Sequence, residues 1–84
     1  MSVVRVRVLA FARVRELLGG AERSLELEAG ARVGDAWSAL VTICPELEPL
    51  AASTRVARNG AIAAPGDGLQ DRDELALLPP VGGG

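Results

Sequence analysis

The chain ends in ALLPPVGGG, the stretch whose residue types most clearly suggest a chemical function. The predicted tail consists of Pro79, Pro80, Val81, Gly82, Gly83 and Gly84. Its glycines have no side chains to block a narrow channel and adopt backbone angles closed to other residues, and its two prolines favour a stiff, extended base. Extended residues of this number reach roughly 20 Å, far enough to enter a neighbouring active site. We therefore interpret the Gly84 carboxylate as a reactive group presented on an arm.

The chemistry of such an arm depends on activation. A carboxylate is a poor electrophile near neutral pH, so it must first be converted, for example to an acyl-adenylate, before a nucleophile can replace one of its oxygens. Terminal glycines alone more often indicate disorder. It is the preceding LALLPPV that favours a carrier arm.

The other residues that could react or bind a metal are better explained by packing or by exposure to solvent. Cys44 lies on the apolar stripe of a predicted helix, where a small buried hydrophobic residue is expected rather than a persulfide carrier. Asp71 and Asp73 lack the spacing of a calcium loop and are expected to be solvated. With no histidine and a single cysteine, a protein-only metal site is not expected. Nothing indicates autonomous catalysis.

Composition limits the class of protein. The 84 residues, 49% of them hydrophobic, suffice for one small domain with a mostly aliphatic core. The formal charge of −2 argues against a nucleic-acid partner. No apolar run could span a bilayer and no signal-like segment is visible, so we expect a soluble, cytoplasmic protein without membrane association. All nine basic residues are arginine, so no lysine side chain can accept an acyl group.

The first half of the chain predicts a hairpin followed by the principal helix. RSLELE forms its second strand, joined to the first by a short helix within FARVRELLGG. The first strand, VVRVRVLA, alternates with period two and buries Val4, Val6, Val8 and Ala10. RVGDAWSALVTICPEL predicts the main helix, which ends before Pro45 and carries the apolar stripe Val33, Trp37, Leu40, Val41 and Cys44.

The second half predicts short strands around turns. ELEPLAAS suggests a helical turn, and RVARNGAIAA has an Asn59-Gly60 hairpin pattern. The following loop is expected to bury Leu69, and ELALL is a last strand ended by two prolines. This order predicts an α+β fold in which a mixed sheet of about four to five strands packs on one main helix, with the first and last strands parallel neighbours. It is the β-grasp arrangement of ubiquitin, with a domain at 1–78 and a tail at 79–84.

Three stretches, VLAFARVRELLG, VARNG and LQDRDELALLPPVGGG, resemble the small, sulfur-carrier subunit of molybdopterin synthase. The similarity covers essentially the whole chain. It is most specific in the Phe-Ala-x-x-Arg-Glu-Leu stretch at 11–17 and in the Leu-Leu-Pro-Pro-Val-x-Gly-Gly ending. Arg72 departs from the usual acidic-Gly-acidic turn and leaves the geometry of that turn open. Gly82 stands where Ser or Thr is common.

The resemblance implies a carrier mechanism. An adenylating enzyme of the ubiquitin-activating type would use ATP to activate the Gly84 carboxylate, and a sulfur donor protein would convert the adenylate to a thiocarboxylate. The tail would then enter the large subunit of molybdopterin synthase, within a heterotetramer of two large and two small subunits. There it would give its sulfur to cyclic pyranopterin monophosphate. No tightly bound cofactor is implied for the carrier.

The resemblance also implies a docking face at Phe11, Ile62 and Leu78. Taken alone, Phe11 is more typical of the core than of an interface, because apolar residues are usually buried, and only the resemblance makes the two interpretations about equal. Ile62 and Leu78 carry the same ambiguity. Their exposure is therefore a point that the fold must decide.

Three alternative functions remain open from the sequence. The first is a carrier for another product, such as the thiazole of thiamine or cysteine. The second is a ubiquitin-like modifier whose Gly84 is linked to lysines of target proteins. The third is an interaction module without acyl chemistry, which would tolerate loss of Gly83 and Gly84.

Overall fold

The computed structural model describes residues 2–80, which form a five-stranded sheet, two α-helices and a 3₁₀ segment. The elements, in chain order, are β1 (Val3–Ala10), α1 (Ala12–Leu18), β2 (Glu22–Glu28), α2 (Val33–Ile43), η1 (Pro45–Ser53), β3 (Arg55–Arg58), β4 (Ala61–Ala63) and β5 (Glu74–Leu78). This is the order that the sequence predicts.

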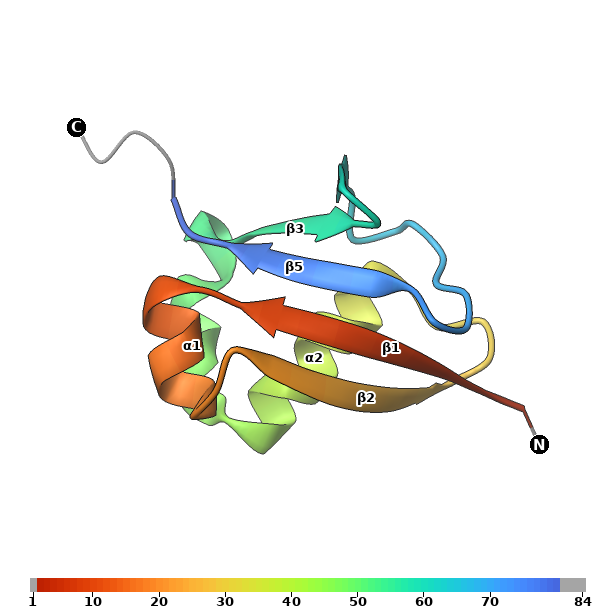
Figure 1. The fold of residues 1–84 in the computed structure, drawn as a ribbon, viewed down its shortest axis with the longest axis horizontal. Coiled ribbons are helices and arrows are strands. Elements are labelled where there is room, and N and C mark those ends of the chain that lie inside the picture. The colour runs from red at the N-terminus through yellow and green to blue at the C-terminus, as the bar shows by residue number, and fades with distance from the viewer. Residues whose placement is uncertain (1, 81–84) are drawn as a thin grey trace.

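The sheet is mixed and has the strand order β2-β1-β5-β3-β4. β1 pairs antiparallel with β2 and parallel with β5, and β3 pairs antiparallel with β5 and β4. The first and last strands are therefore parallel neighbours at the centre, as predicted. In Figure 1, α2 crosses behind the sheet, and α1 lies at the end toward which β1 and β5 run.

The inner face of the sheet forms the core through strand alternation. Every second residue of the two central strands is buried: Val4, Val6, Val8, Ala10, Leu75 and Leu77. On β2, Leu25 is buried and Leu27 is half-buried against the same core. The period-two pattern thus predicts the buried face correctly.

The buried side of α2 is shifted from the predicted stripe. Val33 and Leu40 are buried as expected, but Ala36 completes the buried side, whereas Trp37 is only half-buried. A small side chain lets a helix approach a sheet closely, so the alanine occupies the line of contact and the larger tryptophan lies beside it. The other members of the stripe are also half-buried against the core: Val41 and Cys44.

The helical segments end where the sequence indicates. α1 ends at Gly19, whose φ of +77° is left-handed and whose N–H donates to the carbonyl of Arg15 at 3.0 Å. α2 ends before Pro45, and η1 follows with Leu47 fully buried. Within residues 2–80, no helix combines the length and hydrophobicity needed to cross a membrane.

The segment after η1 positions the last strands. The β3–β4 hairpin turns at Asn59 and Gly60, whose φ angles are +50° and +88°, as the Asn-Gly pattern predicts. Leu69 in the next loop is buried, also as predicted. The expectation for Asp73 is wrong, because its side chain is not solvated: the residue is 6% exposed.

Candidate functional site

The predicted tail begins at the end of the central strand β5. Leu78 is the last residue of β5, and Pro79 and Pro80 follow as exposed residues. Because proline has no N–H to donate to a neighbouring strand, the prolines end the pairing here. The remaining tail residues and the predicted reactive carboxylate lie outside the described residues: Val81, Gly82, Gly83 and Gly84.

The sheet face turned away from α2, here called the outer face, carries an apolar row across four strands. Leu9 of β1 lies beside Ala76 of β5. Ala76 lies beside Ala57 of β3, which in turn lies beside Ile62 of β4. Directly paired residues share a face of the sheet, so these four residues, the apolar row, form one continuous strip.

The three predicted docking residues lie at one end of the outer face. Ile62 is 60% exposed and Phe11 is 43% exposed, while Leu78 is half-buried. Ile62 and Leu78 line the same groove. Phe11 follows Ala10, whose partner on β5 is Leu77, so it lies at the same end of the sheet but outside that groove. Their accessibility fits a docking face, and contact with a partner stays a prediction.

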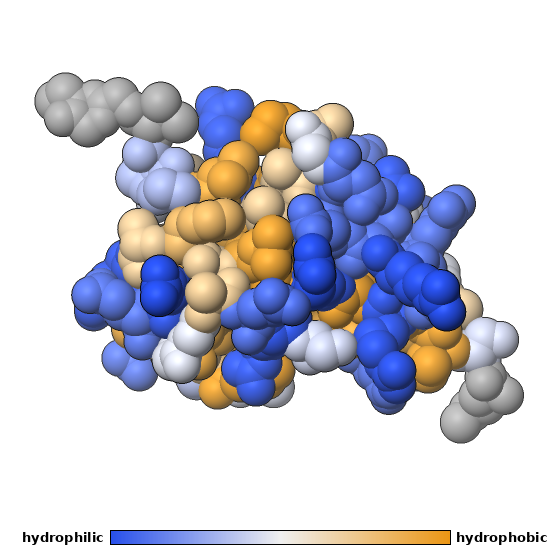
Figure 2. Space-filling model, in the orientation of Figure 1, coloured by the Kyte–Doolittle hydropathy of each residue, from blue (hydrophilic) through white to orange (hydrophobic). Residues whose placement is uncertain are grey.

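Figure 2 shows how the outer face is divided. Hydrophobic residues gather over the ends of β1 and β5 nearest α1, and hydrophilic residues cover most of the rest of these strands, with exposed Val3 at the start of β1 as an exception. One hydrophobic part of the outer face thus lies next to the start of the predicted tail.

The hydrophilic part of the outer face consists of ion pairs. Arg5 pairs with Glu26, and Arg7 lies between Glu22 and Glu74. The hydrogen bond to Glu26 is the main cause that raises the pKa of Arg5, and the one to Glu74 does the same for Arg7. Solvent-exposed pairs contribute little to stability. Their main effect is a polar surface with locally balanced charge.

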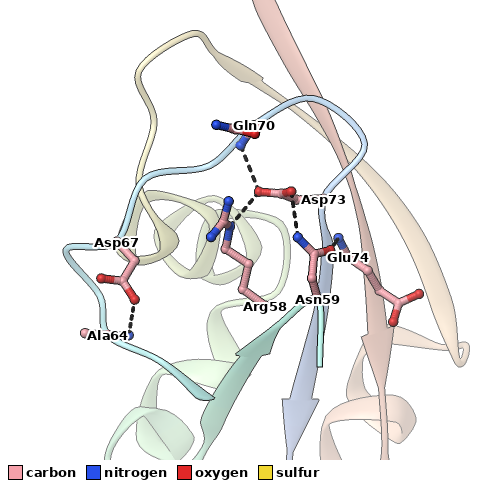
Figure 3. A network of polar contacts seen from close by, with 7 residues as sticks. All are labelled: Arg58, Asn59, Ala64, Asp67, Gln70, Asp73 and Glu74. Atoms are coloured by element: carbon pink, nitrogen blue, oxygen red, sulfur yellow. Dashed lines mark hydrogen bonds and ion pairs between the residues drawn. The ribbon is translucent and has the colours of Figure 1, made fainter. Parts of the chain in front are cut away.

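Asp73, directly before β5, is a buried carboxylate that joins several segments (Figure 3). Arg58 Nε donates to its Oδ2 at 2.7 Å, and the backbone N–H of Gln70 donates to the same oxygen at 2.8 Å. Asn59 Nδ2 donates to Oδ1 at 2.9 Å, and the N–H of Glu74 donates to Asn59 Oδ1 at 2.9 Å. The network connects β3, the hairpin turn and the start of β5, so it fixes the hairpin that carries one end of the apolar row.

These contacts determine the charge of Asp73. Burial alone raises the pKa of the carboxyl, but the hydrogen bonds from Gln70, Arg58 and Asn59 outweigh burial and hold the pKa below its ordinary value. Asp71 is exposed, as expected, and accepts a hydrogen bond from the N–H of Arg5 at 2.8 Å. Within residues 2–80, acidic and cysteine side chains do not gather in groups of three or more as metal ligands.

Cys44 has a packing role in the structure. It is half-buried at the end of α2, and its thiol donates to the carbonyl of Leu17 with an Sγ–O distance of 3.6 Å. This environment agrees with the interpretation of Cys44 as a small, apolar packing residue.

Several site residues were not identified from the sequence. Leu9 and Ala76 occupy outward positions of their strands, where alternation predicts polar residues. Their apolar side chains are therefore a signal that is visible in the sequence. Ala57 and Arg55 carry no such pattern. Their place on the outer face follows from the pairing of β3 with β5, which joins segments distant in sequence.

Comparison with known proteins identifies the family. The sequence model described as the ThiS family matches residues 8–84. The chain belongs to the ThiS family. The molybdopterin synthase sulfur carrier subunit of Arabidopsis thaliana is 36% identical over 83 residues, which cover 99% of this chain and 86% of that protein.

Solved structures agree with this assignment. A crystal structure of H. volcanii small archaeal modifier protein 1 has a TM-score of 0.85 at 36% identity and covers 93% of this chain and 99% of that one. Caldiarchaeum subterraneum ubiquitin has a TM-score of 0.68 at 19% identity and covers 99% of this ThiS-family chain and 100% of its own. This similarity concerns the fold alone. The fold is therefore the ubiquitin-like β-grasp, as predicted.

Proposed function

We propose that this ThiS-family chain is the sulfur-carrier subunit of a molybdopterin synthase. The observation that carries the proposal is its 36% identity to the A. thaliana carrier subunit over 99% of the chain. The geometry supports it, because β5 ends at Leu78 beside an exposed apolar surface and continues into two exposed prolines. A carrier requires both a docking surface and a tail that starts next to it.

The working group of the proposed carrier is the carboxylate of Gly84. In an adenylating enzyme, a carboxylate oxygen attacks the α-phosphorus of ATP, the acyl-adenylate forms and pyrophosphate leaves. A sulfide-level nucleophile from a sulfur donor protein then attacks the carbonyl carbon, a C–S bond forms and AMP leaves. The product is a thiocarboxylate at Gly84. The proposal assigns no tightly bound cofactor to the carrier itself.

The second half of the cycle takes place on the large subunit of the synthase, in an assembly of two large and two small subunits. The thiocarboxylate sulfur, a soft nucleophile, attacks a carbon of cyclic pyranopterin monophosphate. A C–S bond forms as a C–O bond to that carbon breaks, and the displaced oxygen leaves in protonated form. Water then attacks the carbonyl carbon of the resulting thioester, the pterin-bound sulfur leaves, and the Gly84 carboxylate is regenerated. The carrier is thus a cosubstrate of the synthase.

The energetics of docking show why the tail needs a surface beside it. Fixing the backbone of the four residues 81–84 costs about 4–8 kcal/mol. Full burial of Phe11, Ile62 and Leu78 would contribute on the order of 5–9 kcal/mol. With Phe11 43% and Ile62 60% exposed, roughly half of that gain remains available to a partner. The three side chains alone do not offset ordering of the tail, so other residues of the outer face and contacts along the tail must contribute.

The proposal is tested by intact mass measurement. The chain is incubated with ATP, a sulfur source and the adenylating enzyme that the same genome encodes. A variant lacking Gly83 and Gly84 is treated in parallel. We expect a mass increase equal to replacement of one oxygen by sulfur, and its loss in the truncated variant. If no adenylate forms with an adenylating enzyme that is active on its other substrates, the proposal fails.

A second candidate function is favoured by one observation, the 36% identity to small archaeal modifier protein 1 over most of both chains. A modifier would form the same adenylate, but its carboxylate would end in an isopeptide bond with a target lysine. Adenylate formation without sulfur incorporation, together with covalent conjugates in cell extracts, would support this function instead.

A further inference from the structure

A groove lies at the edge of the outer face, next to the start of the predicted tail. The end of η1, three strands and the second proline line it through Ala52, Ser53, Arg55, Ile62, Leu78 and Pro80. Among these lining residues, Arg55 alone is charged, and most of the others are apolar. We refer to this feature as the Arg55 groove.

The sheet register places Arg55 at the junction of the apolar row and the tail. Arg55 pairs with Leu78, the last residue of β5. It lies two residues before Ala57, which pairs with Ile62 of the apolar row. Because residues two apart on a strand share a face, Arg55 and Ile62 lie on the same side of the sheet.

Arg55 differs in its neighbours from three other arginines of the sheet, Arg5, Arg7 and Arg58. Arg5 and Arg7 pair with carboxylates of adjacent strands, and Arg58 pairs with buried Asp73. Within residues 2–80, no carboxylate lies within ion-pair distance of exposed Arg55. The Arg55 groove therefore presents a positive charge in apolar surroundings.

A partner that covers this groove removes water from the guanidinium group. Burial of an unpaired charge is strongly unfavourable, and arginine cannot avoid it by losing its proton at physiological pH. A carboxylate, in contrast, forms two parallel, charge-assisted hydrogen bonds with the planar guanidinium group. A purely apolar partner surface would therefore bind less well than one that carries an acidic residue at this point.

We infer that the Arg55 groove receives a segment of the large synthase subunit that combines an apolar side chain with a carboxylate. The apolar side chain lies between Ile62 and Leu78, and the carboxylate pairs with Arg55. The inference rests on the proposed function, which supplies the partner, and on continuity of the groove with the predicted docking face. Exposed Ile62 and half-buried Leu9 and Ala76 of the apolar row provide contact area, whereas Ala57 is buried. Arg55 selects partners with a negative charge in the matching position.

The test uses calorimetry to measure the affinity of Arg55→Gln and of Arg5→Gln for the large synthase subunit that the same genome encodes. Each substitution removes one positive charge from the outer face, but Arg5 lies in the ion-paired part, away from the groove. We expect Arg55→Gln to weaken binding about 10- to 100-fold and Arg5→Gln to change it less than about twofold. Arg55→Lys keeps the charge without the planar pair of donors and is expected to be intermediate.

The salt dependence gives a readout that a loss of packing would not change. Raising the ionic strength should weaken binding of the wild type and of Arg5→Gln more steeply than binding of Arg55→Gln, because the last has lost the charge pair. Thermal melting of each variant by circular dichroism verifies that the fold is retained.

The outcomes separate the inference from the proposed function. Unchanged affinity of Arg55→Gln, or equal loss in both glutamine variants, overturns the inference and leaves the carrier function in place. An effect of Arg55→Gln that disappears when Gly83 and Gly84 are deleted would identify the chain's own tail as the anion, which also overturns it. A wild-type chain that does not bind the large subunit contradicts the proposed function itself.

Discussion

Arg72 has a φ of +71°, the left-handed region that glycine adopts without a steric penalty. Its N–H donates to the carbonyl of Arg5 at 2.7 Å, and so fixes the turn before β5 to β1. The resemblance to sulfur carriers left the geometry of this turn open, because glycine is usual at this position. The structure shows that the turn tolerates arginine in the left-handed conformation.

The Arg72→Gly variant is therefore expected to be more stable than the wild type. Removal of the side chain relieves about 1 kcal/mol of backbone strain, which corresponds to roughly 4–8 °C in melting temperature for a domain of this size. Thermal melting measures the change. Gln70→Gly, at a position without positive φ, is the matched control and should lower stability. A lower melting temperature for Arg72→Gly would show that the turn is not strained.

Phe11 gives a second test at the scale of a single side chain. Because it is 43% exposed, Phe11→Arg should leave the melting temperature nearly unchanged and weaken binding to the large subunit more than about tenfold. Val14, three residues further and 4% exposed, is the control, since Val14→Arg should prevent folding. Calorimetry and circular dichroism measure the two effects. Unfolding of Phe11→Arg would place Phe11 in the core.

At the scale of elements, the network around Asp73 joins the β3–β4 hairpin to the start of β5. Among residues 2–80, β4 pairs with β3 alone, so the position of its exposed Ile62 depends on how firmly this hairpin is held. A buried carboxylate with well-placed donors fixes such a geometry more specifically than apolar contacts do. The network thus connects a loop residue to the shape of the predicted docking face.

The network predicts how stability depends on pH. The pKa of Asp73 is lower in the folded than in the unfolded chain, so its contribution is fully present above the unfolded pKa of about 4 and is lost as pH falls below it. Asp73→Asn should lower stability at neutral pH and flatten the loss of stability below about pH 4. Chemical denaturation at a series of pH values measures both.

A graded control is available for this prediction. Arg58→Gln keeps the titrating carboxylate but removes its charged donor, so its pH dependence should lie between those of the wild type and Asp73→Asn. Identical acid profiles for Asp73→Asn and the wild type would show that Asp73 does not contribute to the acid sensitivity.

At the scale of the whole molecule, one face of the sheet has two kinds of surface. Ion pairs cover the part around β2 and the start of β5, and apolar side chains cover the part next to the tail. The ion-paired part offers a partner little gain, because its charges are already satisfied within the chain. We therefore expect a partner to bind at the end of the sheet where Pro79 and Pro80 follow β5.

The absence of lysine from the sequence predicts a property of the activated chain. Aminolysis of an acyl-adenylate requires a neutral amine, and no lysine side chain in this protein supplies one. With the adenylating enzyme and ATP but no sulfur source, we expect no side-chain isopeptide bonds between copies. Denaturing gels and peptide mass mapping detect such bonds. Arg5→Lys, which adds an exposed amine, is the positive control, and a wild-type isopeptide dimer would contradict the prediction.

The sequence by itself determined the elements and the buried face of the central strands. Alternation in VVRVRVLA, the Asn59-Gly60 turn and the stop at Pro79 each depend on local geometry. Such features are settled by residues that are close in the chain. For that reason the strand boundaries, the hairpin and the burial of Leu69 were predicted correctly.

Only the tertiary structure decided which side chains meet. Ala36 rather than Trp37 lies on the helix–sheet contact line, Asp73 is buried by donors from β3 and its turn, and Arg55 lines an apolar groove beside Leu78. Each of these results depends on the distance between packed elements or on strand register. Both arise from the fit of the whole core and from pairing between segments far apart in sequence, which no local pattern specifies.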